Sequence, residues 1–247
     1  MSKAQTKALV IGVGAERGLG AALAKRFARE GHHVIVAGRT LDKIETVAAT
    51  IVAEGGRAEH FGVDATSEAD VRAVFDRAFA KDDSDPADLI VFNAGNNQPH
   101  DFRTLAAADF ESAWRIGCFA GFLVGQEAAR RLVPLGRGTI IFTGASGSLR
   151  GRPRFASFAA AKAGLRSVAQ AMAREFGPLG LHVAHVIIDG GIDGDRLNSR
   201  YPERHEQVGA DGLLNIDAIA DAYWQIHRQH RSAWTHELDL RPYKEPF

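Results

Sequence analysis

The chain has 247 residues, of which 45% are hydrophobic and 24% are charged, so it can bury a substantial core. Its 30 basic and 30 acidic residues cancel, which argues against nucleic acid as a partner. Cys118 is the only cysteine, so no internal disulfide can form. No apolar stretch reaches the roughly 18 residues of a membrane span, and no secretory signal is recognisable. These features predict a cytoplasmic protein that contacts neither nucleic acid nor membrane.

Short apolar strands alternate with longer helical patterns along the chain. Strands are expected at about 8–13, 34–37, 58–63, 89–92, 139–143, 182–188 and 234–240. Helices are expected at about 18–30, 41–54, 67–80, 106–133, 155–176 and 217–230. This alternation predicts an α/β fold in one domain over residues 1–247. It should be a doubly wound parallel sheet of about seven strands, with helices on both faces.

The segment 190–216 shows no clear strand or helix pattern and is rich in Gly, Asp, Asn, Arg and Glu. A loop of this length inside a compact domain is commonly a lid or a binding loop. We therefore expect a flexible loop that contacts the substrate.

A glycine-rich turn, Gly14-Ala15-Glu16-Arg17-Gly18-Leu19-Gly20, joins the first expected strand to the first helix. Gly14 is expected to allow the tight turn and Gly18 to let a pyrophosphate approach the backbone. Gly20 is expected to let the helix pack closely on the strand. The free N–H groups at the start of the helix can then bind phosphates. A turn without a ligand is the alternative, but its place in the chain favours dinucleotide binding.

The end of the second strand bears on the choice of dinucleotide. NAD-binding units usually carry an acidic residue there, about 20 positions after the glycines, which binds the ribose 2′-hydroxyl. Here Gly38 stands at that position and Arg39 follows it. Arg39 and Arg17 can neutralise a 2′-phosphate, whereas the neighbouring Glu16 opposes one. The pattern favours NADP(H) over NAD(H), with two solvated surface arginines as the alternative.

The spacing Gly-x-x-x-Gly-x-Gly resembles that of the short-chain dehydrogenase/reductase family, and the resemblance extends from Lys7 to about Leu240. Asp64, followed by Ala65, resembles the aspartate with which the family contacts adenine. Asn93-Ala94-Gly95 resembles its Asn-Asn-Ala-Gly motif. The resemblance implies a single Rossmann-like domain. It also implies a homo-dimer or homo-tetramer formed through the two long helices.

The resemblance is weakest at the catalytic positions. Family members usually carry Tyr-x-x-x-Lys, in which the tyrosine transfers a proton and the lysine lowers its pKa and holds the nicotinamide ribose. Here Lys162 keeps the lysine, while Phe158 replaces the tyrosine. Ala145 replaces the serine that orients the substrate, and Gly117 replaces the asparagine of the proton relay. This pattern resembles a divergent subgroup that has phenylalanine in place of the tyrosine.

The resemblance implies one catalytic residue, Lys162, and no metal. It implies cofactor contacts from Gly14, Glu16, Arg17, Gly18, Leu19, Gly20, Arg39, Asp64, Ala65, Asn93, Ala94, Gly95, Lys162, Gly190 and Ile192.

Two functions remain open on this pattern. The first is an NADP(H)-dependent oxidoreductase acting on a carbonyl or alcohol, with Ser146, Ser148, His100 or a water on Lys162 as a substitute proton donor. The second is a catalytically silent NADP(H)-binding sensor or partner subunit. The arginines before the helix expected at 155–176 can bind an acidic substrate, or they form a solvated basic loop: Arg150, Arg152 and Arg154.

Overall fold

A seven-stranded sheet forms the centre of the structure, a computed structural model that describes residues 5–245. The ends of the predicted 1–247 domain lie outside the described residues. The sheet order is β3-β2-β1-β4-β5-β6-β9, and each neighbouring pair runs parallel. The predicted Rossmann-like parallel sheet is therefore confirmed. Its strands are β1 (Thr6–Ile11), β2 (His33–Gly38), β3 (Arg57–Gly62), β4 (Asp85–Phe92), β5 (Thr139–Thr143), β6 (His182–Ile188) and β9 (Glu237–Leu240).

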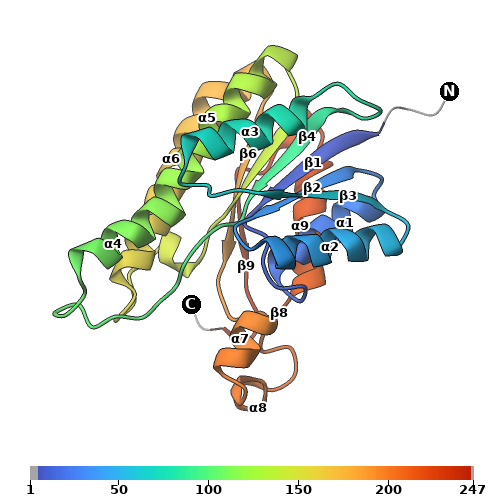
Figure 1. The fold of residues 1–247 in the computed structure, drawn as a ribbon. Coiled ribbons are helices and arrows are strands. Elements are labelled where there is room, and N and C mark those ends of the chain that lie inside the picture. Colours follow the sequence, from blue (N-terminus) through green and yellow to red (C-terminus); the bar gives the residue numbers. More distant parts are fainter. Residues whose placement is uncertain (1–4, 246–247) are drawn as a thin grey trace.

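Helices cover both faces of the sheet, as Figure 1 shows. One apolar core joins the sheet to α1 (Leu19–Arg29), α2 (Leu41–Ala53) and α9 (Ile216–His227). A second core joins its other face to α3 (Glu68–Phe79), α5 (Ala120–Leu132) and α6 (Ala156–Phe176). Because both faces are covered, the central strands are apolar throughout rather than alternating. No helix within residues 5–245 is long and apolar enough to cross a bilayer.

The helix predicted over 106–133 is interrupted. It consists of α4 (Ala107–Trp114), a π-helical turn (Arg115–Phe119) and α5. Gly117 lies in this turn, where an added Cβ would stand 2.8 Å from Ala161 Cβ of α6. Glycine thus allows the turn to pack directly on α6. Such single turns are frequent at functional sites.

The segment 190–216 is folded rather than an irregular loop. It contains β7 (Ile192–Asp193), α7 (Asp195–Arg200), α8 (Arg204–Val208) and β8 (Leu214–Asn215), and the two short strands pair in parallel. Elements of two to six residues are too short to show a hydrophobic period, which explains why the sequence pattern missed them. In Figure 1, α7 and α8 lie beyond the carboxyl ends of the large sheet.

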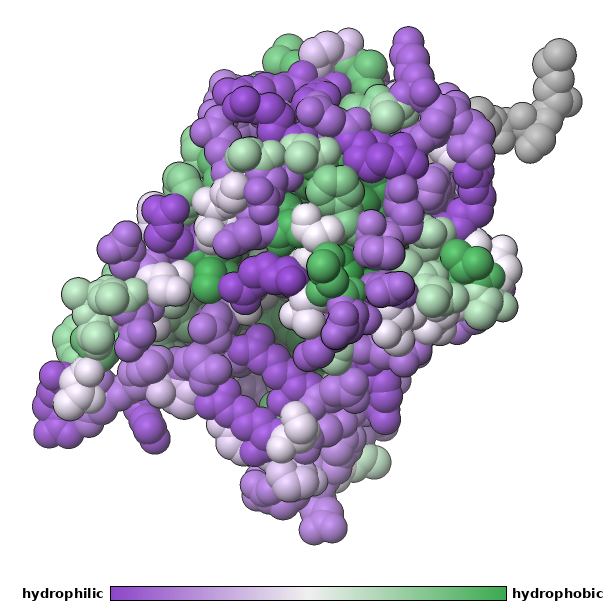
Figure 2. Space-filling view, viewed as in Figure 1, coloured by the Kyte–Doolittle hydropathy of each residue, from purple (hydrophilic) through white to green (hydrophobic). Residues whose placement is uncertain are grey.

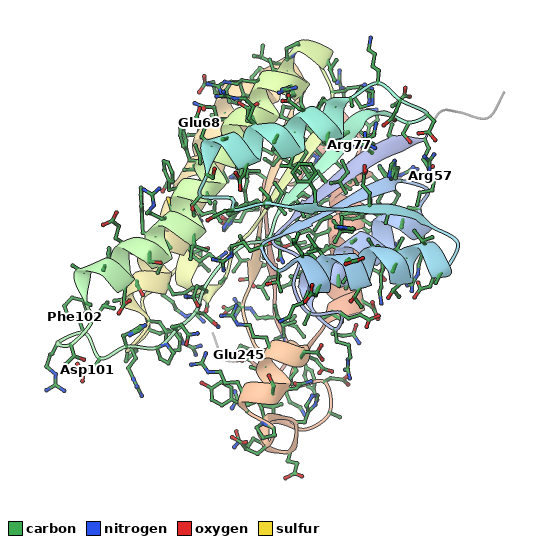
Figure 3. All side chains as sticks on the ribbon, viewed as in Figure 1. Arg57, Glu68, Arg77, Asp101, Phe102 and Glu245 are labelled. Atoms are coloured by element: carbon green, nitrogen blue, oxygen red, sulfur yellow. The ribbon has the colours of Figure 1, made fainter. Side chains whose placement is uncertain are left out.

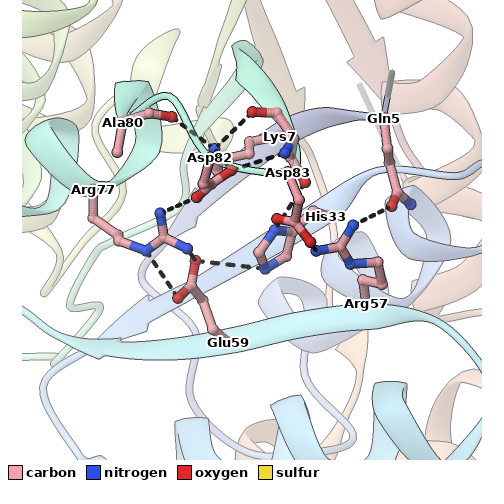
Figure 4. A network of polar contacts seen from close by, with 10 residues as sticks. Gln5, Lys7, His33, Arg57, Glu59, Arg77, Ala80, Asp82 and Asp83 are labelled. Carbon is pink, nitrogen blue, oxygen red and sulfur yellow. Dashed lines mark hydrogen bonds and ion pairs between the residues drawn. The ribbon is translucent and has the colours of Figure 1, made fainter. Parts of the chain in front are cut away.

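An ion-pair network lies at the amino end of β1, opposite the carboxyl ends of the strands (Figure 4). The Lys7 ammonium is fully buried and donates to Asp82 Oδ1 at 2.8 Å and to the carbonyl oxygens of Ala80 and Ser84. Arg77 donates to Asp82 Oδ2 at 2.6 Å. Lys7, and then Arg77, hold the pKa of Asp82 well below its usual range. The network ties β1 to the loop that follows α3.

Candidate functional site

A cleft of about 960 Å³ lies at the carboxyl ends of β1, β4, β5 and β6. Ligands of open parallel sheets bind at this edge, where the strand order reverses, here between β1 and β4. Figure 2 shows a hollow above α7 and α8 with hydrophilic residues around it. Glu245 is one of the cleft residues, and Figure 3 places it beside α7, away from Asp101 and Phe102 at the loop tip.

The cleft gathers nearly all of the residues predicted to bind the cofactor. All but Glu16 line it: Gly14, Arg17, Gly18, Leu19, Gly20, Arg39, Asp64, Ala65, Asn93, Ala94, Gly95, Lys162, Gly190 and Ile192.

The side chain of Glu16 lies outside the lining of the cleft, so its predicted contact with the cofactor stays a prediction. Its Oε1 accepts hydrogen bonds from Thr50 Oγ1 at 3.0 Å and from Lys25 Nζ at 3.4 Å. The hydrogen bond from Thr50, followed by the hydrogen bond and charge of Lys25, lowers the pKa of Glu16. The carboxylate is thus engaged by side chains of α1 and α2.

Gly12, which the sequence analysis missed, makes the tight turn that was assigned to Gly14. Gly12 has φ +95°, and an added Cβ would lie 2.5 Å from the backbone nitrogen of Ala94. At Gly14 an added Cβ would meet nothing within 4 Å. The side-chain nitrogen of Asn93 donates to the Gly12 carbonyl at 3.1 Å, which fixes the turn against β4. Its position directly after the first strand was the sequence feature that could have identified Gly12 as the turn residue.

The predicted close packing of α1 on the first strand is confirmed at Gly20. An added Cβ there would lie 3.0 Å from Val13 Cα and 3.1 Å from the Gly12 carbonyl oxygen. The helix can approach the glycine turn this closely because position 20 has no side chain. Its amino end therefore faces the cleft, where its N–H groups can meet an anion.

Gly38 and Arg39 shape the end of the cleft nearest β2. An added Cβ at Gly38 would lie 2.4 Å from the Val13 carbonyl oxygen, so the backbone contact excludes an acidic side chain there. Arg39 lines the cleft. The backbone N–H of Thr66 lowers the pKa of Asp64, and the charge of Arg39 adds to this. This end of the cleft therefore carries a cation in place of the acid typical of NAD sites.

Lys162 lies at the centre of the site. It is 4% exposed, and its Nζ donates to the carbonyl oxygens of Thr143 at 2.7 Å and Ala94 at 3.4 Å. Burial, together with the charge of Arg196, lowers the pKa of Lys162 to about 8. An added Cβ at Gly95 would stand 3.2 Å from Nζ, so this glycine leaves room for the ammonium.

Phe158 precedes Lys162 by one helical turn of α6 and also lines the cleft. Its ring lies beside Gly147, where an added Cβ would be 3.1 Å from the ring carbon Cδ1. Ala145 and Ser146 line the cleft as well. A phenyl ring, a methyl group and the Ser146 hydroxyl thus share the cleft with the Lys162 ammonium.

Two of the three side chains considered as substitute proton donors lie outside the lining of the cleft. Ser148 Oγ is 3.3 Å from His185 Nε2 in the buried interior. His185 Nδ1 in turn is 3.1 Å from Glu237 Oε2. His100 contacts the neighbouring loop, since its backbone N–H donates to the Arg154 carbonyl at 2.8 Å. Ser146 is therefore the one of the three placed to reach a ligand in the cleft.

The three arginines before α6 differ in their surroundings. Arg150 donates two hydrogen bonds of 3.0 Å to the carboxylate of the buried Asp189, so its charge is already paired. Arg152 lines the cleft and lies 3.9 Å from Glu245. Arg154 is outside the lining and has φ +71°. Of the three, Arg152 is the most accessible to a substrate.

A further set of basic residues was missed because it lies on the short helices of the folded segment. Arg196 of α7 donates to the Gly95 carbonyl and to Asn96 Oδ1, each at 3.4 Å, which brings it close to Lys162. Its pKa is lowered by burial and by the charge of Arg200. The arginines of this segment that line the cleft are Arg196, Arg200 and Arg204.

The lowered pKa of Lys162 predicts a pH effect on stability. The folded state holds this proton less tightly than the unfolded chain, so the cost of burying the charge falls as pH rises from about 8 toward the ordinary value of 10.5. We expect the stability of the wild type, relative to Lys162→Met, to increase over that interval. Urea unfolding of both proteins at pH 7, 8, 9 and 10 measures the difference. A constant difference would contradict the predicted titration.

Comparison with known proteins identifies the family. Residues 7–204 match the short chain dehydrogenase family. Gluconate 5-dehydrogenase from Gluconobacter oxydans (strain 621H) is 32% identical over 171 residues, which span 69% of this chain and 66% of that protein. The 3-oxoacyl-acyl-carrier-protein reductase MabA of Mycobacterium avium is 31% identical over 217 residues, 86% of this chain and 77% of that protein.

Solved structures agree with this assignment. A short-chain dehydrogenase from Rhodopseudomonas palustris is 39% identical with a TM-score of 0.81, over 96% of this chain and 99% of that one. A gluconate 5-dehydrogenase from Burkholderia cenocepacia, solved with NADP and tartrate, shares the fold at 23% identity. Its TM-score is 0.82, over 97% of this chain and 95% of that one. The chain therefore belongs to the short chain dehydrogenase family of oxidoreductases.

Proposed function

We propose that the protein is an NADP(H)-dependent oxidoreductase that interconverts a carbonyl compound and an alcohol through an atypical active site. One observation carries the proposal: the buried Lys162 ammonium lies in the same cleft as the glycine turn and Arg39. When bound, the nicotinamide supplies the hydride. The residues of the chain hold the cofactor, place the substrate and manage a proton.

The choice of NADP(H) rests on the charge at the end of β2. Gly38 leaves no space for an acidic side chain, and Arg39 stands beside it in the cleft. Arg17 adds a second cation in the glycine turn, 4.0 Å from Asp193 and largely exposed. The Burkholderia relative that shares the fold was solved with NADP, which supports the same choice.

Arg39→Ala is expected to weaken NADPH binding about 10- to 150-fold, because charge-assisted hydrogen bonds to a phosphate are worth roughly 1.5–3 kcal/mol. NADH, which lacks the 2′-phosphate, should be affected less than about twofold. Fluorescence and calorimetric titrations with both cofactors measure the two affinities. Arg29→Ala removes an exposed arginine of α1 and serves as the control. Equal losses for both cofactors would contradict the phosphate assignment.

We propose that Phe158 occupies the position of the family's catalytic tyrosine, as in the divergent subgroup described above. Ala145 and Gly117 then occupy the positions of the serine and the asparagine. Gly117 lies in the π-helical turn, where an added Cβ would stand 2.8 Å from Ala161 Cβ, so the turn packs on α6 without a side chain at this position. Lys162 is the catalytic residue that remains. A proton comes from Ser146 or from water held by the Lys162 ammonium.

The substrate is proposed to carry an anionic group. Arg196, Arg200 and Arg204 line the cleft from α7 and α8, and Arg152 lines it from the loop before α6. An arginine binds a carboxylate or phosphate with paired N–H donors. The folded segment 190–216 thereby keeps the substrate-contacting role expected of it.

A second candidate function is a catalytically silent NADP(H)-binding protein that acts as a sensor or partner subunit. The loss of hydroxyl and amide groups at Phe158, Ala145 and Gly117 favours it. Titration with NADPH followed by turnover on a panel of anionic carbonyl compounds separates the two. Binding with turnover supports the enzyme, binding alone supports the sensor, and absence of binding contradicts both.

The protein is also proposed to form a homo-dimer or homo-tetramer through the two long helices. Aromatic side chains of the α4–α5 region are 38–42% exposed: Phe110, Trp114 and Phe122. Burying them in an interface removes apolar surface from water. Light scattering at micromolar concentration should give a multiple of the 26.6 kDa chain mass. A monomer mass would contradict the proposal.

A further inference from the structure

A second group of polar side chains lies at the opposite end of the sheet from the cleft. His32 directly precedes β2, Asp88 lies in the first half of β4, and His227 is the last residue of α9. Parallel pairing through β1 brings the starts of β2 and β4 to one edge of the sheet. One nitrogen or oxygen atom from each residue lies within 4.8 Å of the other two. The three residues are remote in sequence, so no sequence motif identifies them as a group.

Each side chain has an atom available to bind a cation. His32 Nε2 is 3.1 Å from Asp88 Oδ1, so these two atoms already face each other. His227 Nδ1 is 3.0 Å from Thr139 Oγ1, so Nε2 is the ring nitrogen without this contact. A hydrogen bond of this kind on the other ring nitrogen fixes the orientation of metal-binding histidines.

The surroundings hold the two imidazoles in place. The Trp224 ring is 5.7 Å from the His32 ring and 5.4 Å from the His227 ring, and both His32 and Trp224 are buried. Asp88 is partly exposed, which gives solvent a path to the group. The charge facing Asp88 is Arg137, whose Nη1 is 3.9 Å from Oδ2. A cation on Oδ1 therefore leaves this contact intact.

We propose that His32, Asp88 and His227 bind a divalent first-row transition ion, foremost Zn²⁺. Two imidazole nitrogens and one carboxylate oxygen form a donor set that Zn²⁺ prefers, and three protein ligands leave a fourth position for water. Zinc–nitrogen bonds of about 2.0–2.1 Å put tetrahedral ligands roughly 3.3 Å apart. Side-chain shifts of about 1 Å bring the group to that spacing. The ion links β2, β4 and α9 without involving the cofactor.

Zn²⁺ binding is tested on the full-length protein after treatment with a chelator, with no cofactor present. Calorimetry with Zn²⁺ should give one equivalent bound. At a Zn²⁺ concentration about 100 times Kd, Tm should rise by roughly 5 °C, while Mg²⁺ leaves it unchanged. Co²⁺ in place of Zn²⁺ should give the visible absorption of a tetrahedral site. A wild type that binds no Zn²⁺ overturns the proposal and leaves the NADPH titration unaffected.

Two variants locate the ion. Asp88→Asn keeps the size of the side chain and a hydrogen bond to His32 but removes the anionic ligand, and His227→Gln removes a nitrogen ligand. Each should weaken Zn²⁺ binding by at least about tenfold, since even the loss of an outer partner costs 10- to 100-fold. His60→Gln, an exposed histidine of β3, is the control and should bind like the wild type. Unchanged binding in both Asp88→Asn and His227→Gln places the ion elsewhere and overturns the assignment.

Discussion

Phe158→Tyr is expected to raise the rate of NADPH-dependent carbonyl reduction by about 100- to 10,000-fold, the usual contribution of general acid catalysis. Phe158 lines the cleft one helical turn before Lys162, so a hydroxyl added to its ring enters the cleft on the same helix face. The Lys162 ammonium can then lower the pKa of the new phenol. The measurement is the steady-state kcat on anionic carbonyl compounds at saturating NADPH.

Phe155→Tyr is the matched control, because Phe155 also lines the cleft but lacks the one-turn spacing to Lys162. It should leave kcat within about twofold of the wild type, since it places no acid beside the lysine. An equal gain from both variants would mean that added polarity, not a positioned proton donor, raises the rate. No gain from Phe158→Tyr in a protein that binds NADPH would support the silent, cofactor-binding function.

Ala145 and Gly117, proposed to replace a serine and an asparagine, differ in how easily the polar side chain can be put back. Ala145 already has a Cβ in the lining of the cleft, so a serine fits there with one added oxygen. Gly117 cannot accept asparagine in the same way, because its Cβ would lie 2.8 Å from Ala161 Cβ. A substitution can therefore restore the polar group of the family at positions 145 and 158, but not at position 117.

Much of the fold and the cofactor cleft could be predicted because both follow from local patterns. Apolar strands that alternate with helical periods determine the parallel sheet. Parallel strands in turn bring Gly18, Asn93 and Gly190 to one edge. Asp64 and Lys162 were predicted as site residues from the resemblance to the family, because hydrophobic periodicity does not indicate functional positions.

What could not be predicted depends on contacts between segments remote in sequence. The Glu16 carboxylate binds Thr50 and Lys25, and neither pairing is visible in a glycine motif. The arginines of α7 and α8 enter the cleft from helices too short to show a period. The grouping of His32 with His227 likewise requires the folded sheet.

Asp82→Ala is expected to lower the free energy of unfolding by about 3 kcal/mol, because it leaves a fully buried ammonium, that of Lys7, without its carboxylate. The value is at the low end for a broken buried pair because the Asp82 side chain is 29% exposed. Asp83→Ala is the matched control. Asp83 pairs with Arg57 at 2.7 Å, but their side chains are 73% and 41% exposed, so its loss should cost below about 1 kcal/mol. Urea unfolding at pH 7 gives both values.

At acidic pH, Asp82→Ala should lower the free energy of unfolding by less than it does at pH 7. The pKa of Asp82 in the folded protein lies well below the ordinary 3.8, so its stabilising contribution is complete above that value and declines as the pH falls below it. The difference between wild type and variant should therefore narrow when unfolding is measured near pH 3. Lys7→Met combined with Asp82→Ala should recover much of the loss, because the unpaired charge is gone. A double variant as unstable as Asp82→Ala alone would show that the loop after α3, and not the buried charge, sets the cost.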